Sequence, residues 1–541
     1  MKTTSLSTYD SEDESLNRVK KIYKTSSSTL ITDSRNKDID SSSENNTTTT
    51  TTTTSTTITK IDTFFRIFRN SYIKRFIRNR VLQDLKLNIN LSYLNNNHSY
   101  LDKLGEDEKI EYNILIGIII QDRIRFLQFL NNPYKSLVNY LCVCNNVDIS
   151  LQQQKIHKKD VVIDCDIIPQ GIHRLELYVN DNHCGNVHLP HSIRQLVIKN
   201  EFASTKLESV FIQGILSNLP KNLVSLTLPN NLEFTKTDAT ANDKFVMPDS
   251  LTDLTYKSGI VNFERFVVSQ TNKVFKSSVL DVDSMEGLSW LKGQTWITHL
   301  SIYGLPFNNN TFKAIPPHVC ILDIFSQSLI ETANEKLSLP TGLHTLKIYK
   351  YGPPIEPGLI PPQVKTLCLG HYYQRFSARS LPASLTCLSI GGFNCELDPF
   401  ALPSQLKDLF MSDFDNGGYD LSKNSLPPSL ASLDIPSFCG SFSSVGPLNN
   451  LTFLSVFNLN QSVSTIISNL KKVEIWFLDL DHGICLQQTS IQELCLHYNG
   501  VLKHIFFDEM FLPLSLLKLE TNKKIYFKPN SIPSGCVHIV I

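Results

Sequence analysis

The residues of this chain best suited to hold a metal ion gather in one short segment. His183 and Cys184 are followed by His188 and His191. Imidazole and thiolate groups are ligands that Zn²⁺ prefers in proteins. Their spacing is irregular, however, and the segment straddles a turn at Pro190. We therefore expect these residues to lie in a solvated loop that holds no metal ion.

A second group, Asp479, Asp481 and His482, offers the carboxylates and the imidazole used in general acid–base catalysis. No nucleophile accompanies these residues at a defined spacing. The glycine-rich phosphate loop, the hydrolase nucleophile elbow and the kinase signature set are all absent from the sequence. We expect a polar loop here. The sequence predicts neither a catalytic site nor a cofactor, and hence a protein that is not an enzyme.

The secondary-structure elements expected to position these candidate residues are predicted by a repeated sequence phrase. The phrase Leu/Ile-Pro-x-x-Leu-x-x-Leu-x-Ile is clearest at Leu381–Ile390 and returns at Ile168–Leu177 and Ile532–Ile541. Counted at the apolar residue three after the proline, there are sixteen units, and six of the fifteen intervals are 21 residues long. The anchors are Ile172, Ile193, Leu223, Leu251, Ile297, Val319, Leu343, Val364, Leu385, Leu406, Leu430, Leu451, Leu470, Ile491, Leu516 and Cys536. A fixed period of this length is typical of a solenoid.

Each unit has a simple physical interpretation. The proline fixes φ and lacks an N–H, which suits a turn or the first position of a strand. The closing Leu-x-Leu alternation places two apolar residues on one face of a short strand. One such strand cannot bury its apolar face, whereas sixteen stacked in parallel form a continuous core. The longest interval, from Leu251 to Ile297, offers a strand-like ending at Val279–Val282, where a weak further unit is expected.

The units resemble the FNIP repeat, a relative of the leucine-rich repeat found in social amoebae. That repeat joins a Leu-Pro-x-Ser-Leu-x-x-Leu strand phrase to a Gly/Phe-Asn phrase. Leu381–Asn394 matches both halves, and Leu426–Ile435 matches the first. The Phe-Asn pair is lost from most other units. The resemblance covers residues 165–541, about 70% of the chain, and implies a solenoid fold and an interaction role.

The first third of the chain differs in composition. Residues 1–58 are rich in Ser, Thr, Asp and Asn, with an unbroken threonine run at 47–54. They predict disorder, because they bury too little apolar area to offset the entropy of ordering. Residues 60–145 show apolar residues at helical spacing, which predicts a small α-helical domain that caps or precedes the solenoid. The solenoid itself is expected to occupy residues 160–541.

The segment 64–80 is both basic and aromatic. Phe65, Phe68, Tyr72 and Phe76 recur at spacings of 3, 4 and 4, as on one side of a helix. Such a helix suits a membrane surface or nucleic acid, or it packs its aromatic side within a small domain. We favour packing, because the basic residues lie on too many sides to leave one polar face. The segment also resembles the leader of FNIP proteins, which implies a degenerate F-box or a short helical cap.

Aromatic residues recur directly after the predicted strands. Tyr303, Phe325 and Tyr349 fall in consecutive units, so stacked strands would place their rings side by side. Phe457 and Trp476 hold the same position further along. Because the strand face is the usual binding face of a leucine-rich solenoid, these five are the candidate protein-binding residues. The alternative is that the rings stack on one another and only stiffen the sheet.

Composition narrows the class of partner. The chain has 51 basic and 51 acidic residues, so no overall charge favours nucleic acid. The twelve cysteines form no Cys-x-x-Cys pair, as in a protein of a reducing compartment. We expect neither a signal peptide nor a membrane span, and hence a cytoplasmic protein.

Together these features predict a non-enzymatic scaffold that binds protein partners, whose identity stays open, on the strand-lined face of the solenoid. The alternative is an F-box-type substrate adaptor of a ubiquitin ligase. In that case the basic-aromatic helix would dock a linker subunit of the ligase, while the solenoid would hold the substrate.

Overall fold

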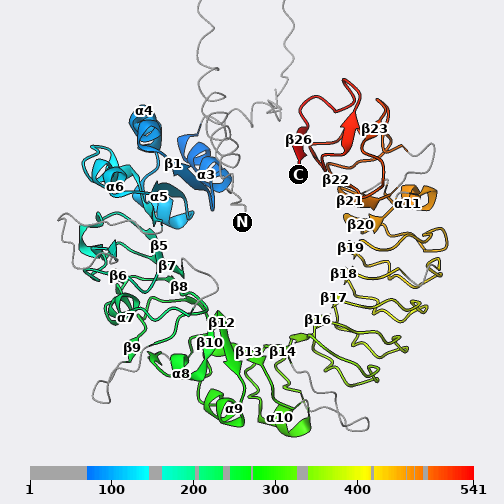
Figure 1. Ribbon diagram of the computed structural model, residues 1–541, viewed down its shortest axis with the longest axis horizontal. Coiled ribbons are helices and arrows are strands. Elements are labelled where there is room, and N and C mark those ends of the chain that lie inside the picture. Colours follow the sequence, from blue (N-terminus) through cyan, green and yellow to red (C-terminus); the bar gives the residue numbers. More distant parts are fainter. Residues whose placement is uncertain are drawn as a thin grey trace, which may run out of the picture. The chain divides into compact units, whose positions relative to one another are not determined.

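A computed structural model shows the fold of the protein (Figure 1). It describes residues 70–144, 161–200, 206–234, 244–269, 272–306, 308–325, 339–415, 419–458, 460–467, 470–478 and 485–541. The chain divides into two compact units, residues 1–251 and 252–541. The predictions for residues 1–58, for Phe65 and Phe68, and for the Asp479–His482 group fall outside the described residues.

The first unit contains a parallel sheet whose strands follow the order of the chain. The strands are β1 (Lys86–Ile89), β2 (Leu115–Ile120), β3 (Tyr140–Val143), β5 (Arg174–Val179), β7 (Gln195–Asn200) and β8 (Ser225–Thr227), and each pairs with the next. The helices are α3 (Ser71–Val81), α4 (Leu91–Leu101), α5 (Glu106–Glu111), α6 (Arg123–Leu130) and α7 (Val210–Ser217). The shorter pieces are η1 (Lys135–Leu137), η2 (Cys165–Ile167), β4 (Val161–Val162), β6 (His183–Cys184) and β9 (Phe245–Val246).

The expectation of a small α-helical domain at residues 60–145 accounts for helices α3 to α6 but misses three strands. Strands β1, β2 and β3 alternate with these helices and continue into β5 as one parallel sheet. The apolar run in β2 is almost wholly buried. A short apolar run of this kind fits a buried helix and a buried parallel strand equally well, so periodicity alone did not separate them.

Two buried polar side chains hold neighbouring segments of this unit together. The side chain of Asn139 accepts a hydrogen bond from the Ile116 N–H at 2.7 Å and donates one to the Ile114 carbonyl at 2.9 Å. The Glu108 carboxylate accepts hydrogen bonds from Asn79 at 2.6 Å and from Arg78 at 2.8 Å, and it also contacts Arg75. The Glu108 bonds fasten α3 onto α5, and the Asn139 bonds fix the segment before β3 against β2. Both sets compensate for the burial of a polar group.

The second unit is a longer parallel sheet built on the same rule. In the described part of the chain fourteen strands pair in sequence, each parallel to the next. They are β10 (Asp253–Gly259), β12 (Phe275–Val282), β13 (Ile297–Ile302), β14 (Ile321–Ile324), β15 (Thr345–Ile348), β16 (Thr366–Leu369), β17 (Cys387–Ile390), β18 (Asp408–Met411), β19 (Ser432–Ile435), β20 (Phe453–Phe457), β21 (Lys472–Phe477), β22 (Glu493–Tyr498), β24 (Lys518–Thr521) and β26 (Val537–Val540).

The remaining elements of this unit lie in the returns between strands. They are α8 (Ile260–Phe263), α9 (Met285–Leu291), α10 (Asn309–Ala314), α11 (Gln461–Ile466), β11 (Phe266–Val267), β23 (Ile505–Phe507) and β25 (Ile525–Phe527). Between β14 and β20 the described returns are loops, as the Asn-, Ser-, Gly- and Pro-rich composition indicates (Figure 1).

These strands confirm the solenoid predicted from the repeat. A strand begins at each of the sixteen anchors or within two residues after it, and β12 supplies the weak further unit expected at Val279–Val282. The chain is thus a leucine-rich-repeat-like β-solenoid of about 17 turns. Within the described residues no helix is both long and apolar enough to cross a membrane.

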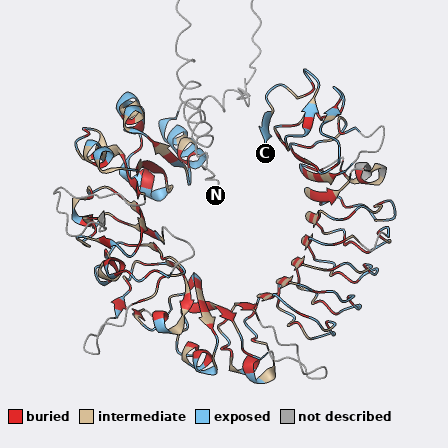
Figure 2. Ribbon diagram, in the orientation of Figure 1, coloured by how far each residue is buried: buried red, intermediate tan, exposed pale blue. Residues whose placement is uncertain are grey.

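The Leu-Pro-x-Ser-Leu phrase folds the same way wherever it is intact. Pro382 opens a turn in which its carbonyl accepts a hydrogen bond from the Leu385 N–H at 3.1 Å. The Ser384 hydroxyl donates to the carbonyl of Val364, the anchor one unit earlier, at 2.7 Å. Leu388 and Ile390 then point into the core, and Figure 2 shows buried residues along these strands. The serine therefore links each turn to the one before it.

A column of buried aromatic rings fills the core beyond the strand ends. The rings of Tyr372, Phe393, Phe414 and Phe438 stack in that order, with centroids 6.5, 5.9 and 5.7 Å apart. Phe393 is the phenylalanine of the Phe-Asn phrase, and the other three hold the equivalent position in neighbouring units. The aromatic half of that phrase is thus retained as core packing where its asparagine has been replaced.

Candidate functional site on the strand face

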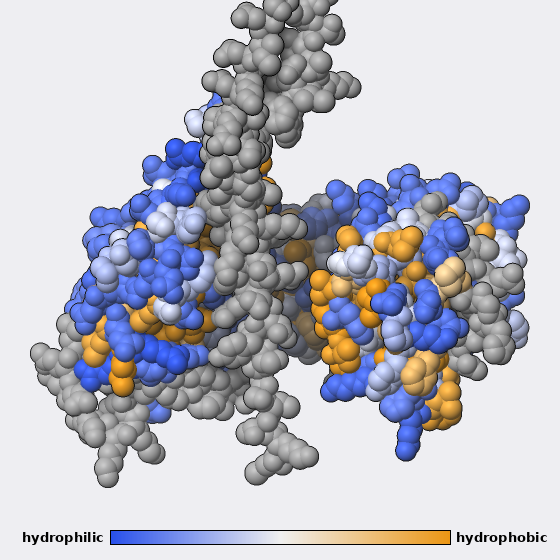
Figure 3. Space-filling view, turned by 90° about the horizontal axis from the view of Figure 1, so that it is seen from above, coloured by the Kyte–Doolittle hydropathy of each residue, from blue (hydrophilic) through white to orange (hydrophobic). Residues whose placement is uncertain are grey.

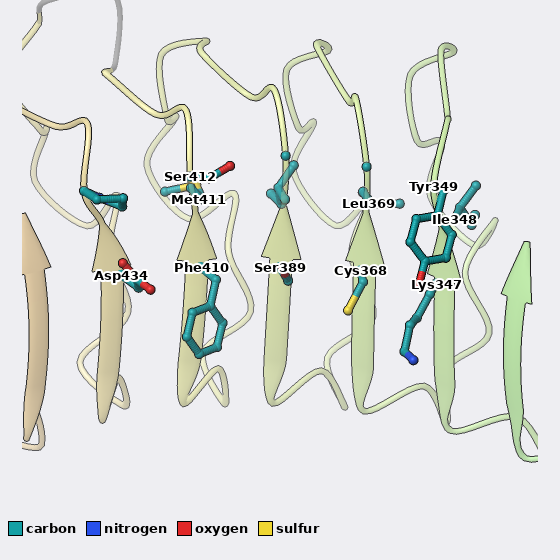
Figure 4. A pocket seen from close by; sticks show the side chains of 14 residues that line it. Lys347, Ile348, Tyr349, Cys368, Leu369, Ser389, Phe410, Met411, Ser412 and Asp434 are labelled. Atoms are coloured by element: carbon teal, nitrogen blue, oxygen red, sulfur yellow. The ribbon is translucent and has the colours of Figure 1, made fainter. Parts of the chain in front are cut away.

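Residues that point away from the core of the second unit form continuous rows, because neighbouring strands pair in the same register. One row runs through Lys347, Cys368, Ser389, Phe410 and Asp434, one residue from each of the strands β15 to β19 (Figure 4). A second row consists of the residues that directly follow each buried strand end. We call these two rows the strand face.

Three rings of the second row stack on one another. The ring centroids of Tyr303 and Phe325 are 4.5 Å apart with planes inclined by 8°. Those of Phe325 and Tyr349 are 4.0 Å apart with planes inclined by 14°. We call these three residues the aromatic ladder. Its two ends differ, because Tyr349 is 44% exposed while Tyr303 and Phe325 are only partly accessible.

A lysine closes the less exposed end of the aromatic ladder. The Nζ atom of Lys257 donates a hydrogen bond to the Tyr303 hydroxyl at 2.8 Å and lies 5.4 and 5.5 Å from the Tyr303 and Phe325 ring centroids. Cation–π attraction at these distances stabilises the stack. In the other row, Asp323 lies opposite Lys347, and its carboxylate is 3.1 Å from the His299 Nε2 atom and 3.4 Å from the Lys347 Nζ atom. The ladder is therefore held in place without a partner.

The strand face is hollowed directly beside Tyr349. Here the second row changes from aromatic residues to Gly370, Gly391 and Ser412, and a groove of about 360 Å³ opens over strands β15 to β19 (Figure 4). Phe410 and the Tyr349 ring contribute apolar surface, while Lys347 and Asp434 lie at opposite ends. Burial raises the pKa of the Asp434 carboxyl above its usual range. The groove therefore offers an apolar middle between a cation and a partly desolvated carboxyl.

The glycine at position 370 has a steric reason. A Cβ atom placed there would lie 2.4 Å from the Tyr349 carbonyl oxygen, so the two backbone segments approach too closely for any side chain at position 370. At Gly391 the nearest atoms to such a Cβ lie 3.8 Å away or more, which leaves room for an alanine. The close approach at Gly370 is what lowers the surface next to the last ring of the ladder.

The other two predicted binding residues lie further along the same row. Phe457 ends β20 and pairs in register with Trp476 of β21. Trp476 stacks on His497 of β22, with ring centroids 3.9 Å apart and planes inclined by 16°. The Trp476 indole N–H donates to the Glu474 carboxylate at 3.2 Å. The structure thus brings Tyr303, Phe325 and Tyr349 together, and Phe457 and Trp476 form a separate group.

A cluster that the sequence analysis missed lies beneath Trp476. Within the described residues, Glu474, Cys495 and His497 are the group of three possible metal ligands whose atoms all come within 4.8 Å of one another. The His497 Nε2 atom is 3.1 Å from the Cys495 Sγ atom and 3.2 Å from a Glu474 carboxylate oxygen. Burial, together with the carboxylates of Glu474 and Glu520, raises the pKa of the Cys495 thiol to about 12.

The His183–His191 segment, considered above as a metal site, does not bring its side chains together in this way. His183 is buried, and its Nδ1 atom lies 3.0 Å from the Asn180 N–H nitrogen, whereas His188 and His191 are exposed. The loop is therefore only partly solvated, since His183 packs inward. No group of three potential metal ligands in the described chain includes these residues.

Comparisons with known proteins assign no family to this chain. No family model matches the chain, and no curated protein matches it. One solved structure that is similar in fold is described as CroV588, a novel circular LRR protein, with 18% sequence identity and a TM-score of 0.41. The match covers 78% of this chain and 61% of that one. The similarity to FNIP repeats therefore remains a resemblance of motif.

Proposed function

We propose that this protein is a non-enzymatic scaffold that binds an extended segment of a partner protein along the strand face of its second unit. The observation that carries the proposal is the aromatic ladder, whose exposed end at Tyr349 forms one rim of the groove. Rigid aromatic rings beside a depression are typical anchors of protein–protein interfaces. Exposed apolar side chains also gather on helix α3 and between Val501 and Ile541, and Figure 3 shows such groups among polar residues on the face that it draws.

The groove indicates what the partner segment should look like. Lys347 and Asp434 lie four strands apart, a path of about 19 Å at the usual strand spacing. An extended peptide of about six residues spans that length. Its middle should be apolar to cover Phe410 and the Tyr349 ring. It should carry an acidic residue near Lys347 and a basic residue near Asp434, because a cation there would relieve the desolvated carboxyl.

A pair of tyrosine variants tests this proposal. Tyr349→Ser removes the exposed end of the aromatic ladder, and Tyr373→Ser removes a tyrosine of similar exposure in the loop after β16 as a matched control. Full-length parent and variants are used as bait in cell extract, and the bound proteins are quantified by mass spectrometry. Partners lost with Tyr349→Ser and kept with Tyr373→Ser support the strand face. Identical partner sets for all three proteins would contradict it.

A second candidate function, the ubiquitin-ligase adaptor, is favoured by one observation. Helix α3 leaves Tyr72 and Phe76 exposed by 75% and 45% of their surface, and Ile77 is similarly exposed. An apolar side of this kind could receive a linker subunit. The helices α3 to α6 alternate with strands of the sheet, however, so they belong to the solenoid more than to a separate helical module. We therefore rank the adaptor second.

One further variant separates the two candidates. Phe76→Ser in the full-length chain should abolish recovery of cullin and linker subunits if the adaptor hypothesis is correct, and it should leave partners of the strand face unaffected. Recovery of no ligase subunit by the parent protein would exclude the adaptor. The proposed compartment is the cytoplasm, which is consistent with twelve cysteines that form no Cys-x-x-Cys pair.

A further inference from the structure

Three side chains of different chemistry converge on one point of the strand face. Glu474 lies on β21, and Cys495 and His497 lie on the neighbouring strand β22 (Figure 1). In the parallel register Glu474 is opposite Cys495, and Trp476 is opposite His497. All three side chains project to the same side because their positions differ by two along each strand. The backbone pairing itself therefore brings a carboxylate, a thiol and an imidazole together.

Trp476 holds two of these groups in position. Its indole N–H donates to the Glu474 carboxylate at 3.2 Å, and its ring stacks at 3.9 Å on the His497 imidazole. Both contacts leave the His497 Nε2 atom directed at Glu474 and Cys495. Protein metal sites commonly have such an outer layer, in which neighbouring groups fix the orientation of the ligands.

The separations suit a tetrahedral metal ion. With zinc bonds of about 2.0–2.3 Å, the ligand atoms of a tetrahedral site lie about 3.4–3.6 Å apart. The contacts from His497 Nε2 are 3.1 Å to Cys495 Sγ and 3.2 Å to the Glu474 oxygen, and all three atoms lie within 4.8 Å. Rotation about the side-chain torsions can adjust these separations while the strands keep their register.

The local charge also favours a cation. Glu520 lies opposite Cys495 on the next strand, β24, so a second carboxylate adjoins the cluster. Two lysines lie nearby, and both are paired: Lys472 lies 3.6 Å from Glu493, and Lys518 lies 2.8 Å from Glu520. Mixed thiolate, imidazole and carboxylate ligands select zinc over magnesium or calcium, which require oxygen ligands.

We propose that Glu474, Cys495 and His497 form a zinc site on the strand face, with a water molecule in the fourth position. The ion would crosslink β21 to β22 at the end of the row that contains Phe457 and Trp476. The assignment is independent of any partner protein, so it stands or falls separately from the scaffold function. A site with three protein ligands keeps one position that a partner side chain can enter.

Cobalt is a direct probe, because Co²⁺ substitutes for Zn²⁺ and absorbs light when a thiolate binds it. The full-length protein is treated with a chelator, exchanged into metal-free buffer and titrated with Co²⁺. We expect one ion per chain and a thiolate-to-cobalt charge-transfer band that Zn²⁺ abolishes. We also expect quenching of Trp476, which is one of three tryptophans in the chain.

Matched variants identify the ligands. Cys495→Ser should lose the charge-transfer band, whereas His497→Asn, which keeps the thiol, should weaken Co²⁺ binding and change the spectrum. Cys368→Ser should keep it, because this cysteine points to the same face but has Lys347 and Ser389 as its register partners. Trp476→Phe keeps a ring over His497 and removes the N–H to Glu474, and we expect it to weaken zinc affinity about 10–100-fold.

Two results would overturn the proposal. One is a folded parent protein, verified by circular dichroism, that gives no charge-transfer band. The other is a band that persists in Cys495→Ser, which would place the metal at another thiol. Should Cys495→Ser fail to fold, His497→Asn tests the same site. Loss of the imidazole leaves the thiol in place but should change both the Co²⁺ affinity and the cobalt spectrum, and no change in either would overturn the proposal.

Discussion

Replacing Leu388 with aspartate tests the repeat frame at its centre. Leu388 is completely buried in β17, where it lies between Leu367 of β16 and Leu409 of β18 in register. Truncating a buried leucine costs about 2–5 kcal/mol through lost contacts and the cavity left behind. An aspartate adds an unpaired polar group, which costs about 2 kcal/mol or more. We expect the local free energy of unfolding to fall by about 4 kcal/mol or more.

Hydrogen exchange read by mass spectrometry measures this loss where it occurs. In a solenoid each turn contacts only its neighbours, so the damage should centre on β16, β17 and β18. A loss of about 4 kcal/mol raises the exchange rate of amides that open locally by about 1,000-fold. Amides in β22 and β24, several turns away, should change little.

The neighbouring residue provides the control. Ser389 points to the strand face, so Ser389→Asp should change stability by less than about 1 kcal/mol. Equal protection in Leu388→Asp and the parent would refute the repeat frame. Equal damage from both variants would show that the two positions do not face opposite sides of the sheet.

Three further predictions concern other parts of the chain. Burial opposes ionisation of Glu108, but hydrogen bonds from Asn79, Arg75 and the Gly105 N–H outweigh it and lower the pKa from 4.5 to about 2. The ionised carboxylate therefore stabilises the fold fully above pH 4.5, and this stabilisation is lost as the pH falls towards 2. Glu108→Gln should lower the free energy of unfolding by about 2–3 kcal/mol at pH 7 and by little at pH 2, as measured by urea unfolding. A Glu108→Gln variant with unchanged stability at pH 7 would contradict this. Gly370→Ala should destabilise the protein by about 1–3 kcal/mol in thermal unfolding while Gly391→Ala remains near the parent, and equal effects would refute the close backbone approach. Phe393→Ala should cost about 3–5 kcal/mol in chemical unfolding because the ring is fully buried in the aromatic column, and a loss below about 1 kcal/mol would exclude that column as core.

The repeat made most of the fold predictable. Twelve of the sixteen anchors follow a proline turn, and an apolar alternation follows the other four as well, so local patterns mark the strands. The weak unit at β12 could be predicted from the apolar alternation of Val279–Val282 alone, although this unit lacks the proline. Strands β1 to β3 were not recognised, since they also lack the proline phrase and their returns are helical. There the apolar pattern of the helices masks that of the strands between them.

The site was predictable in part. The stacking of Tyr303, Phe325 and Tyr349 follows directly from a position shared by consecutive units. The groove forms where Gly370 and Gly391 replace the aromatic residues of the second row. A single glycine in the sequence does not predict such a depression. The cluster of Glu474, Cys495 and His497 was missed because 21 residues separate Glu474 from Cys495 in the sequence. That separation equals the repeat period, so a comparison of equivalent positions in successive units would have found it.

Because the strands of the second unit pair in a uniform register, positions along the strand face are separated by a fixed distance per unit. Tyr349 follows β15 and Trp476 lies in β21, six strand spacings or about 29 Å apart along the sheet. Loss of one whole unit would leave every remaining strand with a neighbour of the same kind and shorten this path by about 4.8 Å. Unit number therefore sets the separation between features in fixed steps, while point substitutions set the chemistry at each step. Such a protein can adapt to a longer or shorter partner by duplicating or deleting turns, without redesigning either end.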